Sequence, residues 1–566
     1  MPQVRPEPSG AIVSQLRIEG VVSWPAEVAE RYRTEGYWRG ATLGRLLHDA
    51  SLRHGPIVAL VDAAVRLTHE QLDQRVAALA ARLLDLGLRR GDRMIVQLPN
   101  CWQFVVLTMA CLRTGVVPVM ALPAHRRIEL THLRDLADAA TIAIPGSTVA
   151  DGGAGFDYQA LARELGFTRV LVVDGLIHTH NQDLTALCDP PTTALDFHDG
   201  CHPQDAAVFL LSGGTTGLPK LIVRTHDDYA YNAMAAAEVS GINHDSVYLV
   251  SLPAGHNFPL ACPGILGTLL AGGRVVMVPS PEPVRCFATI AAEGVTHTAA
   301  VPAVAGRWMD HVTDPTNGYG RTQLASLQVL QVGGARLADE LARRVRPVLG
   351  TQLQQVFGMA EGLLNYTRLD DPDDIVCGTQ GRPLSPADEV RLVDDQDQDV
   401  PDGTVGSLLT RGPYTPRGYF RAPEHNERAF TADGWYRSGD LCRRVSGGYL
   451  IVEGRDKDMI NRGGEKISAE EVENLIYALP AVRQVAAVAM ADAALGERVC
   501  VYVALRPGAT VTLEEIRESM QAAGVARFKL PEHLVVVEEL LVTKVGKVDK
   551  KALREDLAAR LADAGQ

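Results

Sequence analysis

Predicted helices and short apolar strands alternate in the first part of the sequence. The segment His69–Leu88 carries apolar residues at helical spacing, and Trp102–Thr114 is predicted as a second helix. The runs Met94–Leu98 and Val116–Met120 are typical of buried strands. Alternation of this kind predicts a parallel sheet covered by helices, so we expect an α/β fold.

Two later changes of pattern divide the 566 residues. From about Val390 to Leu450 the strands shorten, turns rich in Asp and Gly multiply and helices fade, which predicts a small β-subdomain. Charged residues and glycines after Gly454-Arg455 then mark a linker into a last domain of usual size. We therefore predict an N-terminal core over residues 1–455 and a C-terminal domain over residues 456–566.

Two regions of the predicted core are less regular. Residues 1–40 are expected to form an irregular arm, with Tyr37-Trp38 as its anchor on the body of the protein. Residues 151–203 are rich in loop-forming residues, and the pattern leaves them unassigned. The segment Met1–Gly20 carries prolines and charges but no apolar core, so we read no secretory signal there.

Composition excludes several classes of function. A net charge of −13 argues against a nucleic-acid-binding surface, which would be basic. The longest uncharged stretch, Asn257–Gly273, is broken by prolines and glycines and is shorter than the ~20 apolar residues of a membrane helix. The nine cysteines are scattered without a CxxC pair, which fits a reducing compartment. We expect a cytoplasmic protein that binds neither nucleic acid nor a membrane.

A loop rich in glycine and hydroxyl residues, Leu210–Lys220, follows the apolar run Ala206–Phe209. Its glycines allow backbone N–H groups to approach an anion closely, and its hydroxyls add donors. Lys220 adds a positive charge that suits a phosphate. The spacing differs from that of a Walker A loop. The stretch predicts a polyphosphate-binding loop, with a plain surface turn as the alternative.

Further motifs follow this loop in order, at Gln355–Glu361, Tyr436–Leu441, Gly454–Gly464 and Gly546-Lys547. Together they resemble the adenylate-forming superfamily of acyl- and aryl-CoA ligases, luciferases and peptide-synthetase adenylation domains. The resemblance implies an α/β fold with a large N-terminal domain of stacked αβ subdomains plus a small β-subdomain. It also implies a small mobile α+β C-terminal domain.

Four segments are similar to the stand-alone aryl-acid ligases of siderophore assembly, above all the branch that activates salicylate for mycobactin. They are Leu211–Gly214, Arg224–Tyr229, His256–Leu260 and Met359–Tyr366. The resemblance implies ATP and Mg²⁺ as cofactors and an aryl acid as substrate, with salicylate favoured over 2,3-dihydroxybenzoate. The acid would form an aryl-AMP with release of pyrophosphate and then pass to the phosphopantetheine thiol of a separate aryl carrier protein.

Two other interpretations stay open. An aryl-CoA ligase would share the first step and use free CoA as the thiol. A catalytically inactive module would only bind ATP or aryl acids. The presence of the proposed charged residues argues against this second alternative; they are Lys220, Glu361, Asp440, Arg455 and Lys547.

The resemblance assigns roles residue by residue. Lys547 would bridge the carboxylate and the α-phosphate, His256 would be catalytic beside it, Glu361 would bind Mg²⁺ and Lys457 would be the hinge. The implied ATP-binding residues are Ser212, Gly213, Gly214, Thr215, Thr216, Gly217, Lys220, Gly333, Gly334, Ala335, Gln355, Val356, Phe357, Gly358, Met359, Ala360, Asp440, Arg455 and Lys457. The implied substrate-binding residues are His256, Asn257, Phe258, Cys262, Gly334 and Leu364.

The chemistry of Asn257 favours an aryl acid. Adenylation domains that select amino acids carry an aspartate there, which pairs with the α-ammonium group, whereas a neutral amide can hydrogen-bond a phenolic hydroxyl. Cys262 and Leu364 stand where dihydroxybenzoate enzymes have serine and valine, which favours salicylate. Plainer interpretations remain: Lys547 lies in a run of lysines, Glu361 suits the start of a helix, and His256, Phe357 and Cys262 suit a structural core.

Overall fold

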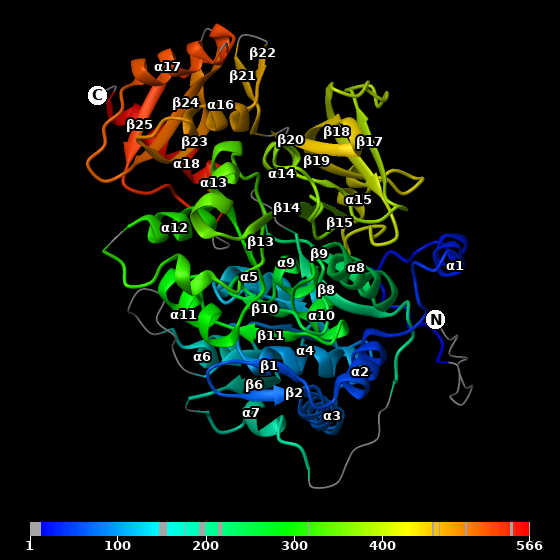
Figure 1. The fold of residues 1–566 in the computed structure, drawn as a ribbon. Helices are drawn as coiled ribbons and strands as arrows, with labels where there is room; N and C mark the ends of the chain where they lie inside the picture. The colour runs from blue at the N-terminus through cyan, green and yellow to red at the C-terminus, as the bar shows by residue number, and fades with distance from the viewer. Residues whose placement is uncertain are drawn as a thin grey trace.

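The computed structural model describes residues 13–146, 156–175, 177–191, 199–212, 218–314, 316–455, 458–462, 465–492, 495–523, 525–543 and 547–564. Two large sheets with their helices form the lower and central part of the molecule (Figure 1). A smaller β-subdomain lies at the upper right and the C-terminal domain at the upper left (Figure 1).

The larger sheet has nine strands in the order β16-β15-β14-β13-β12-β10-β11-β1-β2. Its inner strands pair in parallel, whereas β2, β15 and β16 pair antiparallel at the two edges. The strands are β1 (Val58–Val61), β2 (Arg66–Thr68), β10 (Val247–Val250), β11 (Arg274–Met277), β12 (His297–Ala300), β13 (Val329–Gly333), β14 (Gln352–Met359), β15 (Gly362–Tyr366) and β16 (Arg382–Pro383).

The second sheet has seven strands in the order β7-β6-β5-β3-β4-β8-β9. All its neighbouring strands pair in parallel except β8 and β9, which form an antiparallel pair around the predicted phosphate loop. The strands are β3 (Arg93–Val96), β4 (Val117–Met120), β5 (Thr141–Pro145), β6 (Arg169–Val173), β7 (Gln182–Asp183), β8 (Ala206–Leu211) and β9 (Leu221–Thr225).

Helices cover these sheets, which confirms the predicted α/β class. They are α2 (Leu43–His54), α3 (His69–Asp85), α4 (Trp102–Thr114), α5 (Arg127–Ala137), α6 (Tyr158–Glu164), α7 (Leu184–Leu187), α8 (His226–Val239), α9 (Asn257–Ala261), α10 (Gly264–Leu270), α11 (Pro283–Glu293), α12 (Pro302–Thr313), α13 (Asp339–Leu349) and α14 (Asp373–Gly378). Every residue of α4 is buried, because this helix packs against α2 and α3 as well as against β4 and β8.

The remaining two units also follow the expected order along the chain. The β-subdomain is an antiparallel sheet of β17 (Glu389–Val393), β18 (Val405–Arg411), β19 (Tyr436–Val445) and β20 (Tyr449–Arg455), with α15 (Pro423–Ala429) between β18 and β19. The C-terminal domain holds β21 (Ile460–Arg462), β22 (Glu465–Ile467), β23 (Val482–Asp492), β24 (Gly496–Leu505), β25 (His533–Val537), α16 (Ala469–Tyr477), α17 (Leu513–Ala522) and α18 (Lys550–Ala564). The domain boundary after Arg455 stays a prediction.

One expectation about the two less regular regions of the core needs correction, and the unassigned region contains strands. The N-terminal arm is not wholly irregular, because it contains helix α1 (Ala26–Thr34), at the right of Figure 1. Trp38 is buried and donates from Nε1 to Pro413 O at 2.8 Å, so the predicted anchor is confirmed. The unassigned region 151–203 supplies β6 and β7 at the edge of the seven-stranded sheet.

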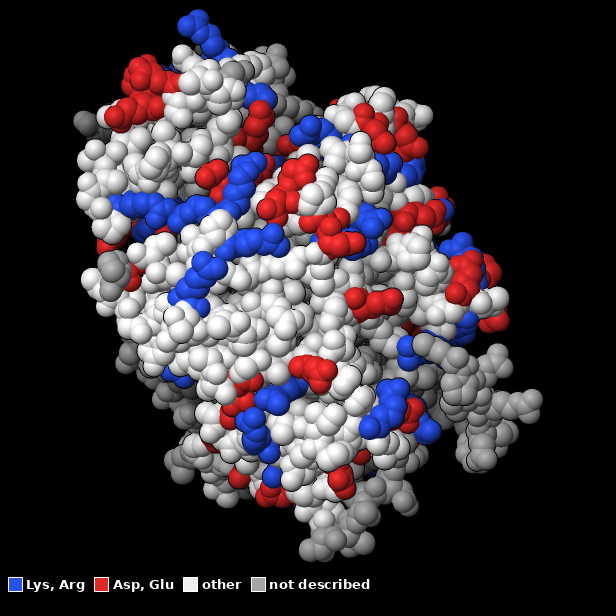
Figure 2. All heavy atoms as spheres, viewed as in Figure 1, with Lys and Arg blue, Asp and Glu red and all other residues white. Residues whose placement is uncertain are grey.

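On the face shown in Figure 2, Lys and Arg side chains are interspersed with Asp and Glu side chains. In the part of the chain that the structure describes, we find no helix long and apolar enough to cross a membrane.

Candidate active site

The β8–β9 hairpin closes the base of the predicted phosphate loop. Ser212 N donates to Lys220 O at 2.9 Å, and Lys220 N donates to Ser212 Oγ at 3.0 Å. The Lys220 ammonium group lies 5.3 Å from the centre of the Tyr419 ring. Five predicted loop residues lie outside the described residues: Gly213, Gly214, Thr215, Thr216 and Gly217. The structure therefore fixes the two ends of the loop.

Glu361 lies in the turn between β14 and β15, so it does not open a helix. Its carboxylate is buried, and Oε1 accepts a 2.8 Å hydrogen bond from Tyr419 OH, which is 3.0 Å from Tyr436 OH. Burial raises the pKa of Glu361 above its usual value. The Tyr419 bond and the positive charges of Arg455 and Lys220 lower the same pKa and so favour the carboxylate.

The surroundings of Glu361 fit a metal that arrives with a nucleotide. Proteins usually bind Mg²⁺ through one or two carboxylates together with substrate phosphates, not through a full protein cage. Among the residues that the structure describes, no group of three or more His, Cys, Asp or Glu side chains could hold a metal ion. A lone buried carboxylate with cations nearby is therefore a suitable arrangement for Mg²⁺ and phosphate together.

Asp440 on β19 and Arg455 on β20 are paired across the antiparallel ladder. Arg455 Nε lies 3.0 Å from Asp440 Oδ1. Burial raises the pKa of Asp440 and the guanidinium opposes that shift, while the Asp440 carboxylate raises the pKa of Arg455. The pair places a hydrogen-bond acceptor and a donor side by side at the end of the β-subdomain, as two ribose hydroxyls would require.

Lys547 reaches from the C-terminal domain into the large domain. A Cβ atom on Gly334, just after β13, would lie 3.3 Å from Lys547 Cε and 3.9 Å from Nζ. Burial and the positive charge of Arg455 lower the pKa of Lys547 to about 8. Asp440 and Glu361 act on the same ammonium group in the opposite direction. The structure thus brings the charged residues of four separate motifs to one place.

His256 lies directly before α9 and caps it, because its Nδ1 accepts a 3.3 Å hydrogen bond from Phe258 N. Burial and the positive charge of Lys547 lower the pKa of His256 to about 4. The imidazole is therefore neutral at pH 7. The capping bond gives His256 a structural role. The effect of Lys547 on the pKa of His256 shows that the two side chains also lie near each other.

Asn257 begins α9, and its amide is held in one orientation. Tyr229 OH donates to Asn257 Oδ1 at 2.8 Å, while Asn257 Nδ2 lies 3.4 Å from Cys262 Sγ. Burial raises the pKa of Cys262 to about 12, so the thiol stays protonated. Below it, Asn232 Nδ2 donates to Ala261 O at 2.7 Å. Both of these partners of the Asn257 amide, Tyr229 and Cys262, are uncharged.

Two glycines make room for the apolar wall of the same pocket. A Cβ atom on Gly333 would lie 3.1 Å from the Phe258 ring, and a Cβ atom on Gly358 would collide with Leu364 Cδ2. Phe258 and Leu364 are both buried. Of the predicted substrate-binding residues, those from His256 to Cys262 lie on or beside α9, Gly334 follows β13, and Leu364 lies in the middle of β15.

Some predicted nucleotide-binding side chains point elsewhere. Gln355 is buried and donates from Nε2 to Val376 O of α14 at 2.7 Å. Phe357 and Met359 pack against the core of the β-subdomain, which favours the structural interpretation of Phe357. Val356 is buried, Ala335 is exposed, and Ala360 O accepts a 3.3 Å hydrogen bond from Arg224 Nη1. Lys457, the predicted hinge residue, lies outside the described residues.

Sequence reasoning missed three tyrosines of the site. Tyr229 orients Asn257, and Tyr419 orients Glu361. Tyr414 OH accepts a 3.2 Å hydrogen bond from Leu364 N. These partners are separated by 28 to 58 residues along the chain. No spacing in the sequence could have revealed such contacts, because they depend on the fold.

Comparisons with known proteins agree with this geometry. The family model described as "AMP-binding enzyme" matches residues 47–420, and that of the "AMP-binding enzyme C-terminal domain" matches residues 471–547. The chain is 60% identical over 95% of its length to a Streptomyces protein named salicylyl-CoA synthase / salicylate adenylyltransferase, of which 97% is covered. It is 46% identical over 98% of its length to the salicyl-AMP ligase / salicyl-S-ArCP synthetase of Mycobacterium tuberculosis, of which 96% is covered.

A solved structure, the apo form of MbtA from Mycobacterium smegmatis, superposes with a TM-score of 0.70 at 44% identity, covering 95% of this chain and 99% of that one. The expected resemblance and the use of ATP with Mg²⁺ are thereby confirmed. Both family models and all three relatives lead to one conclusion: the chain belongs to the AMP-binding enzymes, which activate their substrates with ATP and Mg²⁺.

Proposed function

We propose that the protein converts salicylate and ATP into salicyl-AMP and pyrophosphate. The observation that carries this proposal is the neutral, hydrogen-bonded Asn257 beside Cys262, close to a site of charged residues that includes Lys547. A pocket without a carboxylate offers no ion pair to an amino acid, while the Asn257 Nδ2 group can donate to a phenolic oxygen. Two relatives are named for activities on salicylate, and these names support the same assignment.

The first step brings two anions together, the carboxylate of the acid and the α-phosphate of ATP. Lys547 is the residue we assign to bridge them, since its ammonium group lies next to Gly334 and near the neutral His256. Holding the two reactants in line and neutralising their charge are the main contributions that such a site can make. Asp440 and Arg455 would hold the ribose while this occurs.

The phosphates need their own cations. Lys220 would contact them from the β8–β9 loop, and Glu361 would hold Mg²⁺, which supplies positive charge to phosphate oxygens when bound. The Tyr419 hydrogen bond holds one oxygen of Glu361 in place, and we assign the carboxylate so held to the metal ion. We assign these roles to this chain as part of the same proposal.

For the second step we propose transfer to the phosphopantetheine thiol of a separate aryl carrier protein in a siderophore-type pathway. A specific observation favours a second candidate: the relative at 60% identity is named a CoA synthase. Carrier protein and CoA present the same pantetheine thiol, so the adenylation site alone does not distinguish them. Relative rates of thioester formation with CoA and with an aryl carrier protein would decide between the two acceptors.

A lysine that bridges the carboxylate and the α-phosphate during adenylation would leave no room for an incoming thiol. We therefore propose that residues 456–566 rotate as a unit against residues 1–455, with Lys457 as the hinge. Hinges of this kind concentrate large backbone changes in a few residues. Lys457→Pro fixes φ and should impair thioester formation more than adenylation. Equal loss of both half-reactions would count against this hinge.

The adenylation proposal is tested by ATP–pyrophosphate exchange over a panel of salicylate, 2,3-dihydroxybenzoate, benzoate and anthranilate. We expect exchange with aryl acids and the highest kcat/KM for salicylate. Benzoate lacks the 2-hydroxyl and should be poorer, because it has no oxygen at that position to accept a hydrogen bond from Asn257 Nδ2. Exchange with none of these acids, in a protein that binds ATP, would overturn the proposal.

A further inference from the structure

The turn that carries Glu361 and Leu364 has a strained backbone. Gly362 has φ +102°, and the fully buried Leu363 has φ +48°. A positive φ is rare for a leucine and persists only where the surrounding structure imposes it. Glu361, on one side of Leu363, is the proposed metal ligand, and Leu364, on the other, forms part of the aryl pocket. Because Leu363 has a positive φ, contacts from outside the turn must stabilise this backbone conformation.

The segment 412–420, which we call the clamp, contacts the turn at three points. Tyr419 OH donates to Glu361 Oε1 at 2.8 Å. Thr415 packs on Gly362, where a Cβ atom would lie 2.6 Å from Thr415 Cα. Tyr414 OH accepts from Leu364 N at 3.2 Å. The clamp thus contacts Glu361, Gly362 and Leu364, the residues on both sides of Leu363.

The hydroxyl of Tyr414 makes two hydrogen bonds that fix its orientation. It donates its hydrogen to Asp388 Oδ2, which also accepts a 3.0 Å hydrogen bond from Ser385 N. A hydroxyl that donates to Asp388 must use a lone pair for Leu364 N. Tyr414 is fully buried, so loss of its hydroxyl would leave two buried polar groups without that partner.

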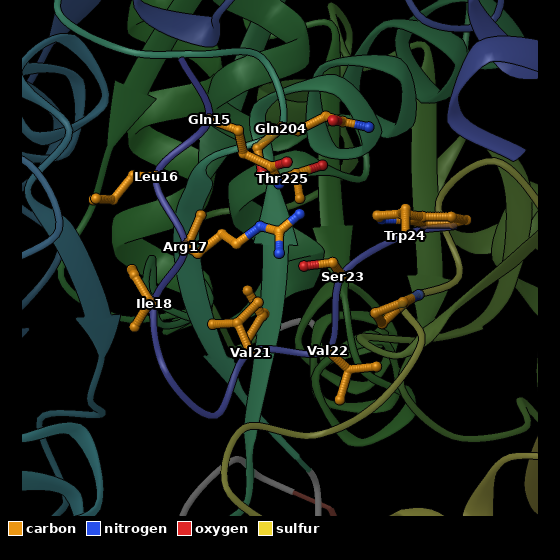
Figure 3. A pocket seen from close by; sticks show the side chains of 13 residues that line it. Gln15, Leu16, Arg17, Ile18, Val21, Val22, Ser23, Trp24, Gln204 and Thr225 are labelled. Carbon is orange, nitrogen blue, oxygen red and sulfur yellow. Dashed lines mark hydrogen bonds between the residues drawn. The ribbon is translucent and has the colours of Figure 1, made fainter. Parts of the chain in front are cut away.

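The N-terminal arm holds the clamp from the other side. Trp38 Nε1 donates to Pro413 O at 2.8 Å, and the Arg417 guanidinium lies 5.0 Å from the centre of the Trp24 ring. Figure 3 shows the arm from Gln15 to Trp24 running past Thr225 of β9, where its side chains line a cavity of about 20 Å³. The arm therefore joins the phosphate-loop hairpin to the clamp.

We propose that the N-terminal arm is a positioning element of the active site, which acts through the clamp, with Tyr414 as the positioning residue for Leu364. The inference rests on the proposed function, because Leu364 matters for the choice between salicylate and 2,3-dihydroxybenzoate. When the clamp loosens, Leu364 moves away from the pocket and the 3-hydroxyl gains space. Discrimination between the two acids then falls.

The test compares Tyr414→Phe and Trp38→Phe with the full-length parent by ATP–pyrophosphate exchange. The readout is the ratio of kcat/KM for salicylate to that for 2,3-dihydroxybenzoate, which a loss of folded protein alone does not change. The matched control is Tyr231→Phe. Its ring lies 6.0 Å from the Tyr414 ring and its hydroxyl donates to Ser385 Oγ at 2.7 Å, so this hydroxyl bonds to a residue outside β15.

We expect the ratio to fall about fivefold in Tyr414→Phe, which corresponds to one buried hydrogen bond. Trp38→Phe should lower it in the same direction by a smaller factor, and Tyr231→Phe should leave it unchanged. If Tyr414→Phe does not fold, Trp38→Phe decides. An active parent whose folded Tyr414→Phe and Trp38→Phe variants keep the parent ratio would overturn the clamp alone. A parent that exchanges with no aryl acid would overturn the proposed function itself.

Discussion

The aryl pocket and the contact between the two domains are built in opposite ways. In the pocket, the buried Tyr229 fixes the amide of Asn257, and Cys262 lies against that amide. Across the domain contact, Arg506 Nη1 forms a half-exposed 2.9 Å ion pair with Asp310. The pocket lies within one domain, and its groups are neutral and buried.

The second region includes polar contacts between the two domains. Besides that ion pair, Ser468 Oγ of the C-terminal domain donates to Glu453 O, and Lys547 lies beside Gly334. Exposed ion pairs contribute on the order of 0.2–1 kcal/mol each. The difference teaches that the groups we propose to recognise the acid are buried within one domain, whereas the group we propose to supply charge comes from the other domain. Such a division suits an enzyme with two half-reactions.

Removal of the Lys547 charge, which comes from the C-terminal domain, should have the largest effect on adenylation. Lys547→Ala should lower the adenylation rate by more than about 10²-fold, the range for removal of one group that stabilises developing charge. Thermal unfolding should stay close to that of the parent. Lys551→Ala is the control, since this exposed lysine of the same charge run pairs with Glu555. Near-normal exchange by folded Lys547→Ala would remove this lysine from the mechanism.

The pH dependence of adenylation tests the charge of Lys547 in a second way. The pKa of Lys547 is lowered to about 8, so its cation is complete below that pH and is lost as the pH rises through it. Because kcat/KM reports the free enzyme, it should fall up to about tenfold per pH unit above pH 8. Lys547→Arg, slower but always charged, should show no such fall. A parent profile that stays flat to pH 9.5 would contradict the assignment.

The smallest effect should come from the domain contact itself. Arg506→Ala removes the ion pair to Asp310 and should lower adenylation by up to about fivefold at low salt, with little effect on thioester formation. The effect should disappear at high salt because the pair is exposed. Arg483→Ala is the control, since this arginine bonds to Glu538 within the C-terminal domain. Equal effects of the two substitutions would argue against a contact specific to adenylation.

Sequence reasoning predicted the parts of the molecule that local patterns encode. The strand pattern of Met94–Leu98 and the helix pattern of Trp102–Thr114 are enough to predict the parallel sheet, because each pattern repeats over only a few neighbouring residues. The ordered motifs predict that Asp440, Arg455 and Lys547 serve one site. In the structure Arg455 pairs with Asp440, and both groups act on the pKa of Lys547, while their roles stay a prediction.

Other features lay beyond sequence reasoning for physical reasons. Helix α1 is short and lies in a segment without strong periodicity, so the arm looked irregular. The hydrogen bonds of Tyr229, Tyr414 and Tyr419 join distant parts of the chain, and a buried tyrosine looks the same in sequence whether it packs or positions. Such contacts follow from the tertiary fold alone.

The most direct test of the account is the selectivity between salicylate and 2,3-dihydroxybenzoate, measured by ATP–pyrophosphate exchange in the parent and in Cys262→Ser/Leu364→Val. A buried 3-hydroxyl beside a thiol loses water without a good partner, at a cost of about 1–3 kcal/mol, or roughly 5- to 150-fold in kcat/KM. The parent should favour salicylate by that factor, and the double substitution should narrow the ratio. A parent that prefers 2,3-dihydroxybenzoate, or a double variant that keeps the parent ratio, would contradict the account.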